Sequence, residues 1–171
     1  DTLNSLPETV FCDGCAEVIK YGVLYDRELF EHLSQKGLNF DRETVIARCI
    51  ELKRNVVAED EFDTGARQKL NLGHTIGHGV EAQSNFTITH GQAVAIGMAI
   101  VSKAGCRLIY DQLCAVLKKF NLPTTTTFSA DQLHTSALSD KKRSGGTVNL
   151  IIPREIGYCE IVPTPVEELQ S

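Results

Sequence analysis

Apolar residues recur every three or four positions through most of the chain, which is the spacing of one face of an α-helix. This criterion predicts a series of helices, over residues 15–25, 26–37, 41–61, 66–83, 90–105, 110–120 and 131–138. In the third of these segments, Val45, Cys49 and Leu52 would share one buried side. Asp41 is a suitable N-cap for the same helix. The segment 90–105 is apolar nearly all round, so we expect it to be a buried central helix.

The end of the chain departs from the helical pattern. Residues 147–152 and 158–162 are rich in β-forming side chains, and they flank Pro153 and Gly157. This arrangement predicts a small hairpin. We therefore expect one mainly α domain over residues 1–171, a helical bundle with a small C-terminal β-hairpin.

The composition fits an ordinary globular domain and excludes several classes of protein. Of the 171 residues, 42% are hydrophobic and 23% are charged. The formal charge of −5 argues against nucleic-acid binding, because phosphate neutralisation needs a basic face. No apolar run reaches the length of a membrane span, so no membrane partner and a cytoplasmic location are expected. The first residue is Asp rather than Met, which suggests an excised fragment.

The six cysteines do not form the pattern of a disulfide framework or a structural zinc site. Cys49, Cys106 and Cys114 fall in apolar helical segments, where a free thiol behaves as a small hydrophobic group. Cys12 and Cys15 make one Cys-x-x-Cys pair, but no second pair accompanies it. We expect these cysteines to contribute to packing.

Three of the five histidines lie close together in the sequence and are the candidate chemistry of the chain. His74 and His78 are four residues apart on a predicted helix, so their Cβ atoms should be about 5–6 Å apart on one face. No Glu follows His74, which removes the general base of a zinc protease. Gly73, Gly77 and Gly79 each cost about 1 kcal/mol in a helix relative to Ala, which indicates close approach of a ligand or of another helix. From spacing alone, packed histidines remain an alternative to a metal site.

His90 favours the metal site. It lies at the predicted start of the buried helix, where the positive end of the dipole keeps an imidazole neutral and able to bind a metal. The same helix end would also favour a nearby anion. Glu17 is a candidate third ligand, although Lys20 one turn later allows an ordinary helical ion pair instead. Two histidines and a glutamate with an open position are typical of catalytic zinc.

These motifs, taken together, resemble those of 3-dehydroquinate synthases. The motif Asn-Leu-Gly-His at 71–74 and the His-Gly pair at 90–91 are specific to the wider sugar-phosphate cyclase superfamily when both occur. Further similar segments keep the family's order and spacing, at residues 16–22, 51–53, 60–61, 93–98 and 140–142. The resemblance extends from about residue 5 to residue 162.

The resemblance implies a domain plan and a chemistry. The chain would be the helical C-terminal domain that carries a divalent metal, Zn²⁺ or Co²⁺, while a separate N-terminal domain, absent from this chain, would bind most of the NAD. The complete enzyme of the shikimate pathway would convert 3-deoxy-D-arabino-heptulosonate 7-phosphate to 3-dehydroquinate and phosphate. The isolated chain would be inactive or nearly so. Family members are commonly homodimers, and we expect the same here.

The resemblance also implies roles for particular residues. The metal ligands would be Glu17, His74 and His90, and the proton carriers would be His78 and Asp63. The sugar-acid phosphate would be bound by Lys20, Lys53, Arg67, Asn71, Lys141 and Lys142. Thr2 to Ser5 would be the end of a hinge segment, with Thr2 and Ser5 near the NAD.

The sequence departs from the family at two positions near the site, and several other functions stay open. Asp63 stands where Glu is usual, and Gln92 follows His90-Gly91 where Glu is common. One alternative is another cyclase that acts on a different sugar phosphate. A metal-dependent alcohol dehydrogenase is a more distant one, because the 71–74 motif fits it poorly. A non-catalytic helical module with packed histidines is the third.

Overall fold

The structure is a computed structural model, and it describes residues 2–62, 65–133 and 146–165. In chain order, the elements are η1 (Thr2–Ser5), α1 (Glu8–Tyr25), α2 (Arg27–Lys36), η2 (Gly37–Asn39), α3 (Arg42–Glu59), η3 (Ala66–Asn71), α4 (His74–Gln83), α5 (His90–Gly105), α6 (Arg107–Lys119), β1 (Thr147–Glu155) and β2 (Tyr158–Pro165). The predicted fold class, a helical bundle with a C-terminal hairpin, is confirmed. Among the described helices, none is both long and apolar enough to cross a membrane.

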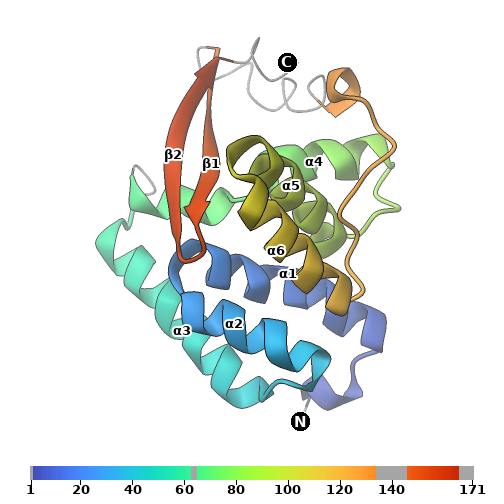
Figure 1. Ribbon diagram of the computed structural model, residues 1–171, viewed down its shortest axis with the longest axis vertical. Coiled ribbons are helices and arrows are strands. Elements are labelled where there is room, and N and C mark those ends of the chain that lie inside the picture. Colours follow the sequence, from blue (N-terminus) through green and yellow to red (C-terminus); the bar gives the residue numbers. More distant parts are fainter. Residues whose placement is uncertain (1, 63–64, 134–145, 166–171) are drawn as a thin grey trace.

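The bundle is organised around two helices. α1 crosses the middle of the molecule, with α2 and α3 on one side and α4, α5 and α6 on the other (Figure 1). α5 is the buried central helix that its composition predicts, and it contacts α1, α4, α6 and β1. Its side chains from Ala93 to Ala99 are almost wholly inaccessible to solvent. The main core therefore lies between α1 and α5.

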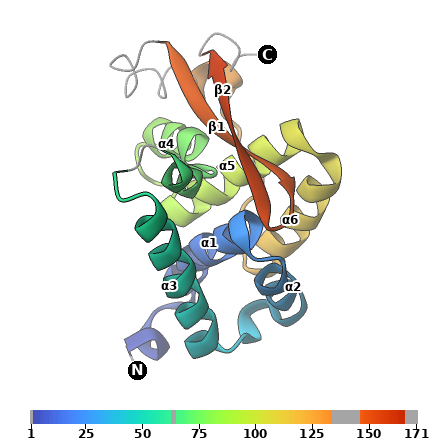
Figure 2. The same cartoon turned by 90° about the vertical axis from the view of Figure 1, so that its left-hand side faces the viewer.

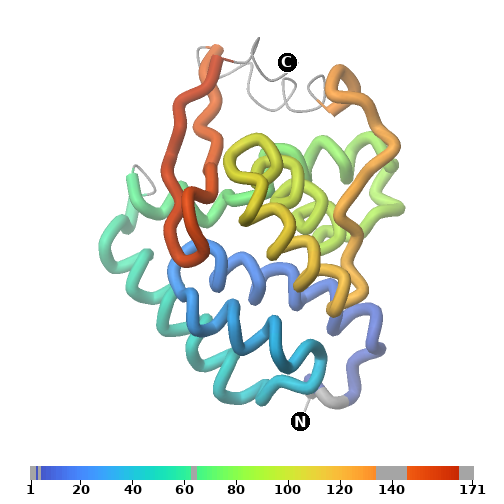
Figure 3. The backbone as a smooth tube through the Cα atoms, in the orientation of Figure 1, coloured from blue at the N-terminus to red at the C-terminus, as the bar shows by residue number. Residues whose placement is uncertain are grey.

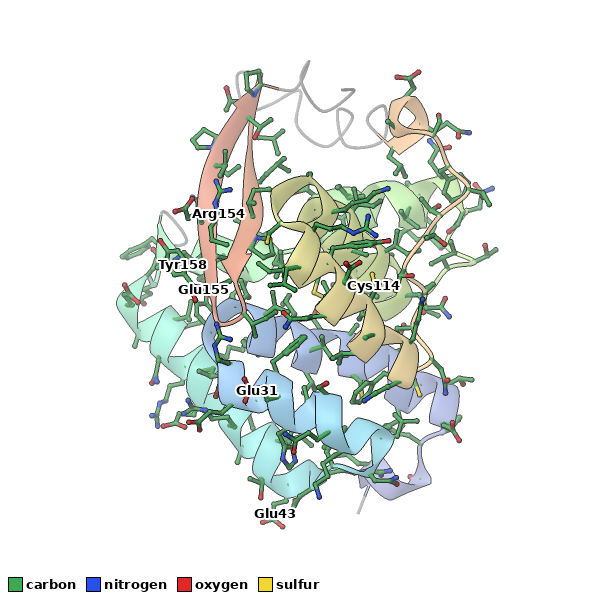
Figure 4. The ribbon with its side chains drawn as sticks, viewed as in Figure 1. Glu31, Glu43, Cys114, Arg154, Glu155 and Tyr158 are labelled. Carbon is green, nitrogen blue, oxygen red and sulfur yellow. The ribbon has the colours of Figure 1, made fainter. Side chains whose placement is uncertain are left out.

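The hairpin closes one side of the bundle. β1 and β2 pair antiparallel, and the hairpin stands beside the helices and reaches from the start of α2 upward past α6 (Figure 2). In the backbone tube, its turn lies next to the end of α1, far away in sequence (Figure 3). There, the backbone amide of Gly157 donates to the carbonyl of Val23 over 3.0 Å. Glu155, labelled at this end of the hairpin in Figure 4, accepts from Arg27 over 3.2 Å. The sequence suggested that Pro153 lies between the two strands, but it lies within β1.

The boundaries of the first helix differ from the prediction. α1 starts at Glu8, two turns before the predicted start at residue 15. Glu8 and Val10 in the first turn are exposed, whereas Phe11 and Cys12 already face the core, so the apolar face of the helix begins before the predicted boundary. The start is fixed by Pro7, whose carbonyl accepts from the amides of Val10 and Phe11 at 3.0 Å each.

The predicted continuous helix over 66–83 is wrong. The chain forms the 3-10 helix η3, turns at Leu72 and Gly73, and begins α4 at His74. Gly73 has φ of +78°, a conformation that favours glycine. A Cβ atom on Gly73 would come within 2.7 Å of the Val94 carbonyl on α5, so the break lets α4 pack directly against α5. The predicted helix over 131–138 lies mostly outside the described residues, of which 130–133 are helical.

Candidate metal centre

Three side chains from three helices converge at the start of α5. Glu17 comes from the middle of α1, His74 is the first residue of α4, and His90 is the first residue of α5. The Nε2 atom of His74 lies 3.5 Å from Oε1 of Glu17, and Nε2 of His90 lies 3.9 Å from the same oxygen. Tetrahedral zinc with bonds of about 2.0–2.1 Å holds its ligand atoms roughly 3.3 Å apart. The three atoms therefore need only small shifts to share one ion.

The helices are held close together by glycine and by Asp13. On Gly97 of α5, a Cβ atom would lie only 2.0 Å from the Gly73 carbonyl, and on Gly91 it would lie 2.0 Å from the Asp13 carbonyl. The carboxylate of Asp13 accepts from the backbone amide of Gln92 over 3.0 Å and from the hydroxyl of Thr89. Asp13 is one helical turn before Glu17, so this contact fixes Glu17 opposite the first turn of α5. The glycines of the 71–79 segment thus serve helix packing.

The N-terminus of α5 is capped by Thr89 and Gln92 and lies against the carboxylate of Asp13. Besides Asp13, a capping box joins Thr89 and Gln92, in which the side chain of Gln92 accepts from the Thr89 amide over 3.2 Å. Gln in place of the family's usual Glu therefore preserves the cap. The negative charge at this helix end comes from Asp13, which sequence reasoning did not single out.

Glu17 has one oxygen engaged and one free to bind. Its Oε2 accepts from the ammonium of Lys20 over 2.6 Å, which is the helical ion pair considered as the alternative. Among the described residues, the buried Oε1 has no hydrogen-bond partner. A buried carboxylate oxygen without a donor is costly, unless a cation or water completes it. The ion pair and the ligand role are therefore compatible, with one oxygen serving each.

His74 presents a neutral imidazole with its Nε2 lone pair free. Nδ1 of His74 lies 3.1 Å from the carbonyl oxygen of Leu72, an acceptor only, so Nδ1 carries the proton and Nε2 has the free lone pair. Burial lowers the pKa of His74, and the nearby Lys20 cation lowers it further. Burial also lowers the pKa of Lys20 itself, which is 3% exposed. The residues present thus fit a divalent metal, in ligand type, spacing and protonation state.

The other predicted site residues are distributed around this centre. His78 is exposed, and its ring centre is 5.7 Å from that of His74 and 6.4 Å from that of His90. Lys53 is exposed on α3 and close enough to Lys20 to lower its pKa. Arg67 and Asn71 lie on η3, which leads into His74. The backbone amide of Arg67 donates to Asp60 over 3.0 Å.

Five further predicted residues lie outside the described part of the chain or in its first element. Asp63, Lys141 and Lys142 lie outside the described residues. Thr2 and Ser5 are in η1. Their roles stay predictions.

The cysteines take no part in this centre. Cys12 and Cys15 are buried on α1, and burial raises the pKa of Cys15 to about 12. Such thiols are neutral and unreactive near pH 7. The expected packing role fits this environment.

Sequence reasoning missed Glu81, the residue that lies against the far side of His90. Its Oε1 is 3.2 Å from Nδ1 of His90, and its side chain is 15% exposed. Glu81 follows His74 and His78 by seven and three residues, so helical periodicity could have indicated it. His78, Glu81 and His90 form a second group whose potential ligand atoms lie within 4.8 Å of one another.

Known proteins resemble this chain in sequence along nearly its whole length. Residues 14–143 match the family described as 3-dehydroquinate synthase C-terminal. The 3-dehydroquinate synthase of Streptococcus suis (strain 05ZYH33) is 38% identical over 182 residues, which cover 99% of this chain and 51% of the relative. That of Clostridium perfringens (strain 13 / Type A) is 39% identical over 177 residues, covering 96% and 51%. The chain spans about half the length of the curated relatives it matches.

Solved structures share the fold at lower sequence identity. ValA, a 2-epi-5-epi-valiolone synthase from Streptomyces hygroscopicus subsp. jinggangensis 5008 with NAD⁺ and Zn²⁺ bound, gives a TM-score of 0.85 at 23% identity, covering 98% of this chain and 51% of that one. A 2-deoxy-scyllo-inosose synthase complexed with carbaglucose-6-phosphate, NAD⁺ and Co²⁺ gives 0.79 at 21%, with the same coverage. At this identity, the likeness is evidence for the fold alone.

Proposed function

Because the chain belongs to the 3-dehydroquinate synthase C-terminal family, we propose that it forms the metal- and substrate-binding half of a 3-dehydroquinate synthase. The resemblance inferred from the motifs is thereby confirmed. The proposed reaction is the conversion of 3-deoxy-D-arabino-heptulosonate 7-phosphate to 3-dehydroquinate and phosphate, a step of the shikimate pathway. The observation that carries this proposal is the convergence of Glu17, His74 and His90, where one buried oxygen of Glu17 has no hydrogen-bond partner among the residues that the structure describes.

The three converging residues would hold a divalent ion, Zn²⁺ or Co²⁺, with a coordination position left for substrate. Such an ion supplies Lewis-acid polarisation of a substrate hydroxyl, and NAD supplies a reversible hydride acceptor. The ammonium of Lys20 pairs with Oε2 of Glu17, while Oε1 faces the two histidines. The chain's own part is thus to fix the three ligand side chains, correctly oriented, in a partly buried place.

The substrate is an anion with a carboxylate and a phosphate, and cationic side chains would bind it. Lys53 is exposed, and its charge lowers the pKa of Lys20. Arg67 lies on η3, the element that leads into His74. The chain as a whole has a charge of −5, so a local group of Lys and Arg would attract the substrate against the general field. Asn71, Lys141 and Lys142 are proposed to complete this group.

His78 is proposed to carry protons rather than to bind the metal. It is exposed beside both histidine ligands, so its ring nitrogens can exchange protons with a bound substrate and with water. Asp63 is proposed as a second proton carrier. Imidazole is the side chain that most often transfers protons in catalysis.

The remaining parts of the enzyme are proposed to lie outside these 171 residues. An N-terminal domain would bind most of the NAD, with Thr2 and Ser5 at the junction, and the complete protein would act as a cytoplasmic homodimer. The isolated chain should bind NAD weakly and show little or no turnover. Dehydroquinate formation by the chain alone, measured with NAD and zinc supplied, would contradict this division of labour.

The metal site is tested by zinc titration of the chain, followed by calorimetry and elemental analysis. We expect one zinc ion per chain. Zinc binding should be lost or much weaker in Glu17→Ala, His74→Ala and His90→Ala. His78→Ala should keep the metal. His32→Ala is the matched control, because His32 lies on α2, an element without a proposed ligand. Circular dichroism would establish that each variant is folded.

Two outcomes would overturn the assignment. Absence of zinc binding by the folded chain would favour the non-catalytic helical module. Equal loss of zinc in the variants of His74, His78 and His90 would show that the ligand set is wrong.

Substrate choice separates dehydroquinate synthase from other cyclases. The relatives named above are 3-dehydroquinate synthases at 38–39% identity, which favours an acid substrate. The zinc-loaded chain should bind the heptulosonate phosphate more tightly than glucose 6-phosphate, and Lys53→Ala should narrow the difference. Equal binding of the two ligands would favour another cyclase.

A further inference from the structure

The two ring nitrogens of His90 face two different carboxylates. Nε2 is 3.9 Å from Oε1 of Glu17, and Nδ1 is 3.2 Å from Oε1 of Glu81. A neutral imidazole carries one proton, so the nitrogen that holds it donates a hydrogen bond and the other offers a lone pair. The position of this single proton therefore decides which ring nitrogen of His90 can bind a metal, and whether Glu17 or Glu81 lies beside that metal.

Glu81 is held in place on the side of His90 away from Glu17. It lies near the end of α4, and its backbone carbonyl accepts from the hydroxyl of Ser84 and the amide of Phe86, each over 2.9 Å. Its side chain is 15% exposed, while that of His90 is 47% exposed. A carboxylate at this distance is an acceptor, and the donor available to it is the Nδ1–H of His90.

We propose that Glu81 is a positioning residue of the metal site, which holds the proton of His90 on Nδ1 and so turns the Nε2 lone pair toward Glu17. This inference rests on the proposed function, since it assumes the metal ligands given above. His74 reaches the same state by another route, with its Nδ1 bound to the Leu72 carbonyl at 3.1 Å. Both histidines would then bind through Nε2, one oriented by a backbone carbonyl and the other by a carboxylate.

The rival arrangement places the metal between His78, Glu81 and His90. That group also has its potential ligand atoms within 4.8 Å of one another, but it would require the lone pair of His90 on Nδ1. Three observations favour the first arrangement. His74 is a partly buried imidazole whose Nδ1 is already satisfied, Oε1 of Glu17 is buried without a described partner, and His78 is exposed to water. Within the described part of the chain, the first site therefore has a ligand nitrogen and a carboxylate oxygen that make no other hydrogen bond.

The test compares Glu81→Ala and Glu81→Gln with Glu31→Ala, a control on the exposed face of α2 (Figure 4). The first readout is the tautomer of His90 in the metal-free chain, observed by ¹⁵N NMR of the imidazole. Wild type should have the proton on Nδ1, and Glu81→Ala should shift it toward Nε2. Glu81→Gln keeps an acceptor oxygen and should retain most of the wild-type population.

The second readout is metal affinity, with the Co²⁺ absorption spectrum as a check on the ligands. Loss of such an outer partner typically weakens metal binding by about 10- to 100-fold. We expect that loss in Glu81→Ala, with a Co²⁺ spectrum of the wild-type type, because all three ligands remain. Glu81→Gln should lie between the two, and Glu31→Ala should match wild type.

Several outcomes overturn the proposal. If the tautomer of His90 and the zinc affinity are the same in Glu81→Ala as in Glu31→Ala, while His74→Ala loses zinc, Glu81 has no positioning role and the proposed metal site stands. If Glu81→Ala and His78→Ala abolish zinc binding while Glu17→Ala keeps it, the metal occupies the rival group. If no variant alters zinc binding, the proposed function itself fails.

Discussion

The close approach of α4 and α5 predicts that Gly97→Ala is strongly destabilising. A Cβ atom on Gly97 would lie 2.0 Å from the Gly73 carbonyl, whereas ordinary contacts begin near 3.4 Å. The two helices would have to move about 1.4 Å apart, the difference between these distances. Both sides of the contact are backbone, so no side chain can rotate to relieve it.

The magnitude follows from two opposing effects. Overpacking a core costs typically 1–3 kcal/mol, and a backbone clash belongs at the upper end. Replacing Gly by Ala in a helix returns about 1 kcal/mol. The free energy of unfolding should therefore fall by about 2 kcal/mol, which lowers the Tm by roughly 4–8 °C for a chain of this length. Zinc affinity should fall as well, because His74 moves with Gly73 away from Glu17.

Urea denaturation and thermal unfolding of the metal-free chain measure this effect, and Gly14→Ala is the matched control. Gly14 lies within α1, and a Cβ atom there would meet nothing within 4 Å. The same substitution at Gly14 should stabilise the chain by about 0.5–1 kcal/mol. A Gly97→Ala chain as stable as wild type would refute the inferred contact between α4 and α5.

Three further predictions concern the site. Burial lowers the pKa of His74 in the folded chain, so the unfolded chain binds more protons at this residue. The free energy of unfolding of the metal-free protein should therefore decrease as pH falls below 6.5, and it should decrease less in His74→Gln. Equal pH profiles of the two proteins in urea titrations would contradict this. Asp13→Ala removes the acceptor for Thr89 and Gln92, so unfolding should need about 0.5–2 kcal/mol less and zinc affinity should drop. Zinc at 100 times its Kd should stabilise the chain by about 2.7 kcal/mol, and a chelator should reverse the Tm shift; an unchanged Tm would argue against a native-state site.

Local signals in the sequence were sufficient for most of the fold. Helical periodicity found α3 and α5, and the capping residues Asp26 and Asp41 accept from the amides of Leu29 and Thr44, as N-caps do. The hairpin followed from its β-forming residues around Gly157. These features depend on residues near one another in the chain, which is why a single sequence contains them.

What the sequence could not supply depends on contacts between distant segments. The break at Gly73 follows from the position of α5. The residue type alone does not tell whether a glycine is helical or left-handed. Asp13 was missed for the same reason, since it acts on the first turn of α5 from another helix, whereas Glu81 could have been found from its helical spacing to His74 and His78. The family motifs implied the proposed ligand set, but not the residues that we propose to orient it.

The ligands of the proposed site come from chain positions 17, 74 and 90, on three different helices. None of those helices could assemble the site alone, even when fully formed. A metal bound there would link chain positions 17, 74 and 90 only in the folded state, so it would stabilise the arrangement in which the three helices are docked. The visible absorption of bound Co²⁺ would then report on the docking of α1 against α4 and α5. Its rate of appearance during refolding would measure this docking separately from helix formation.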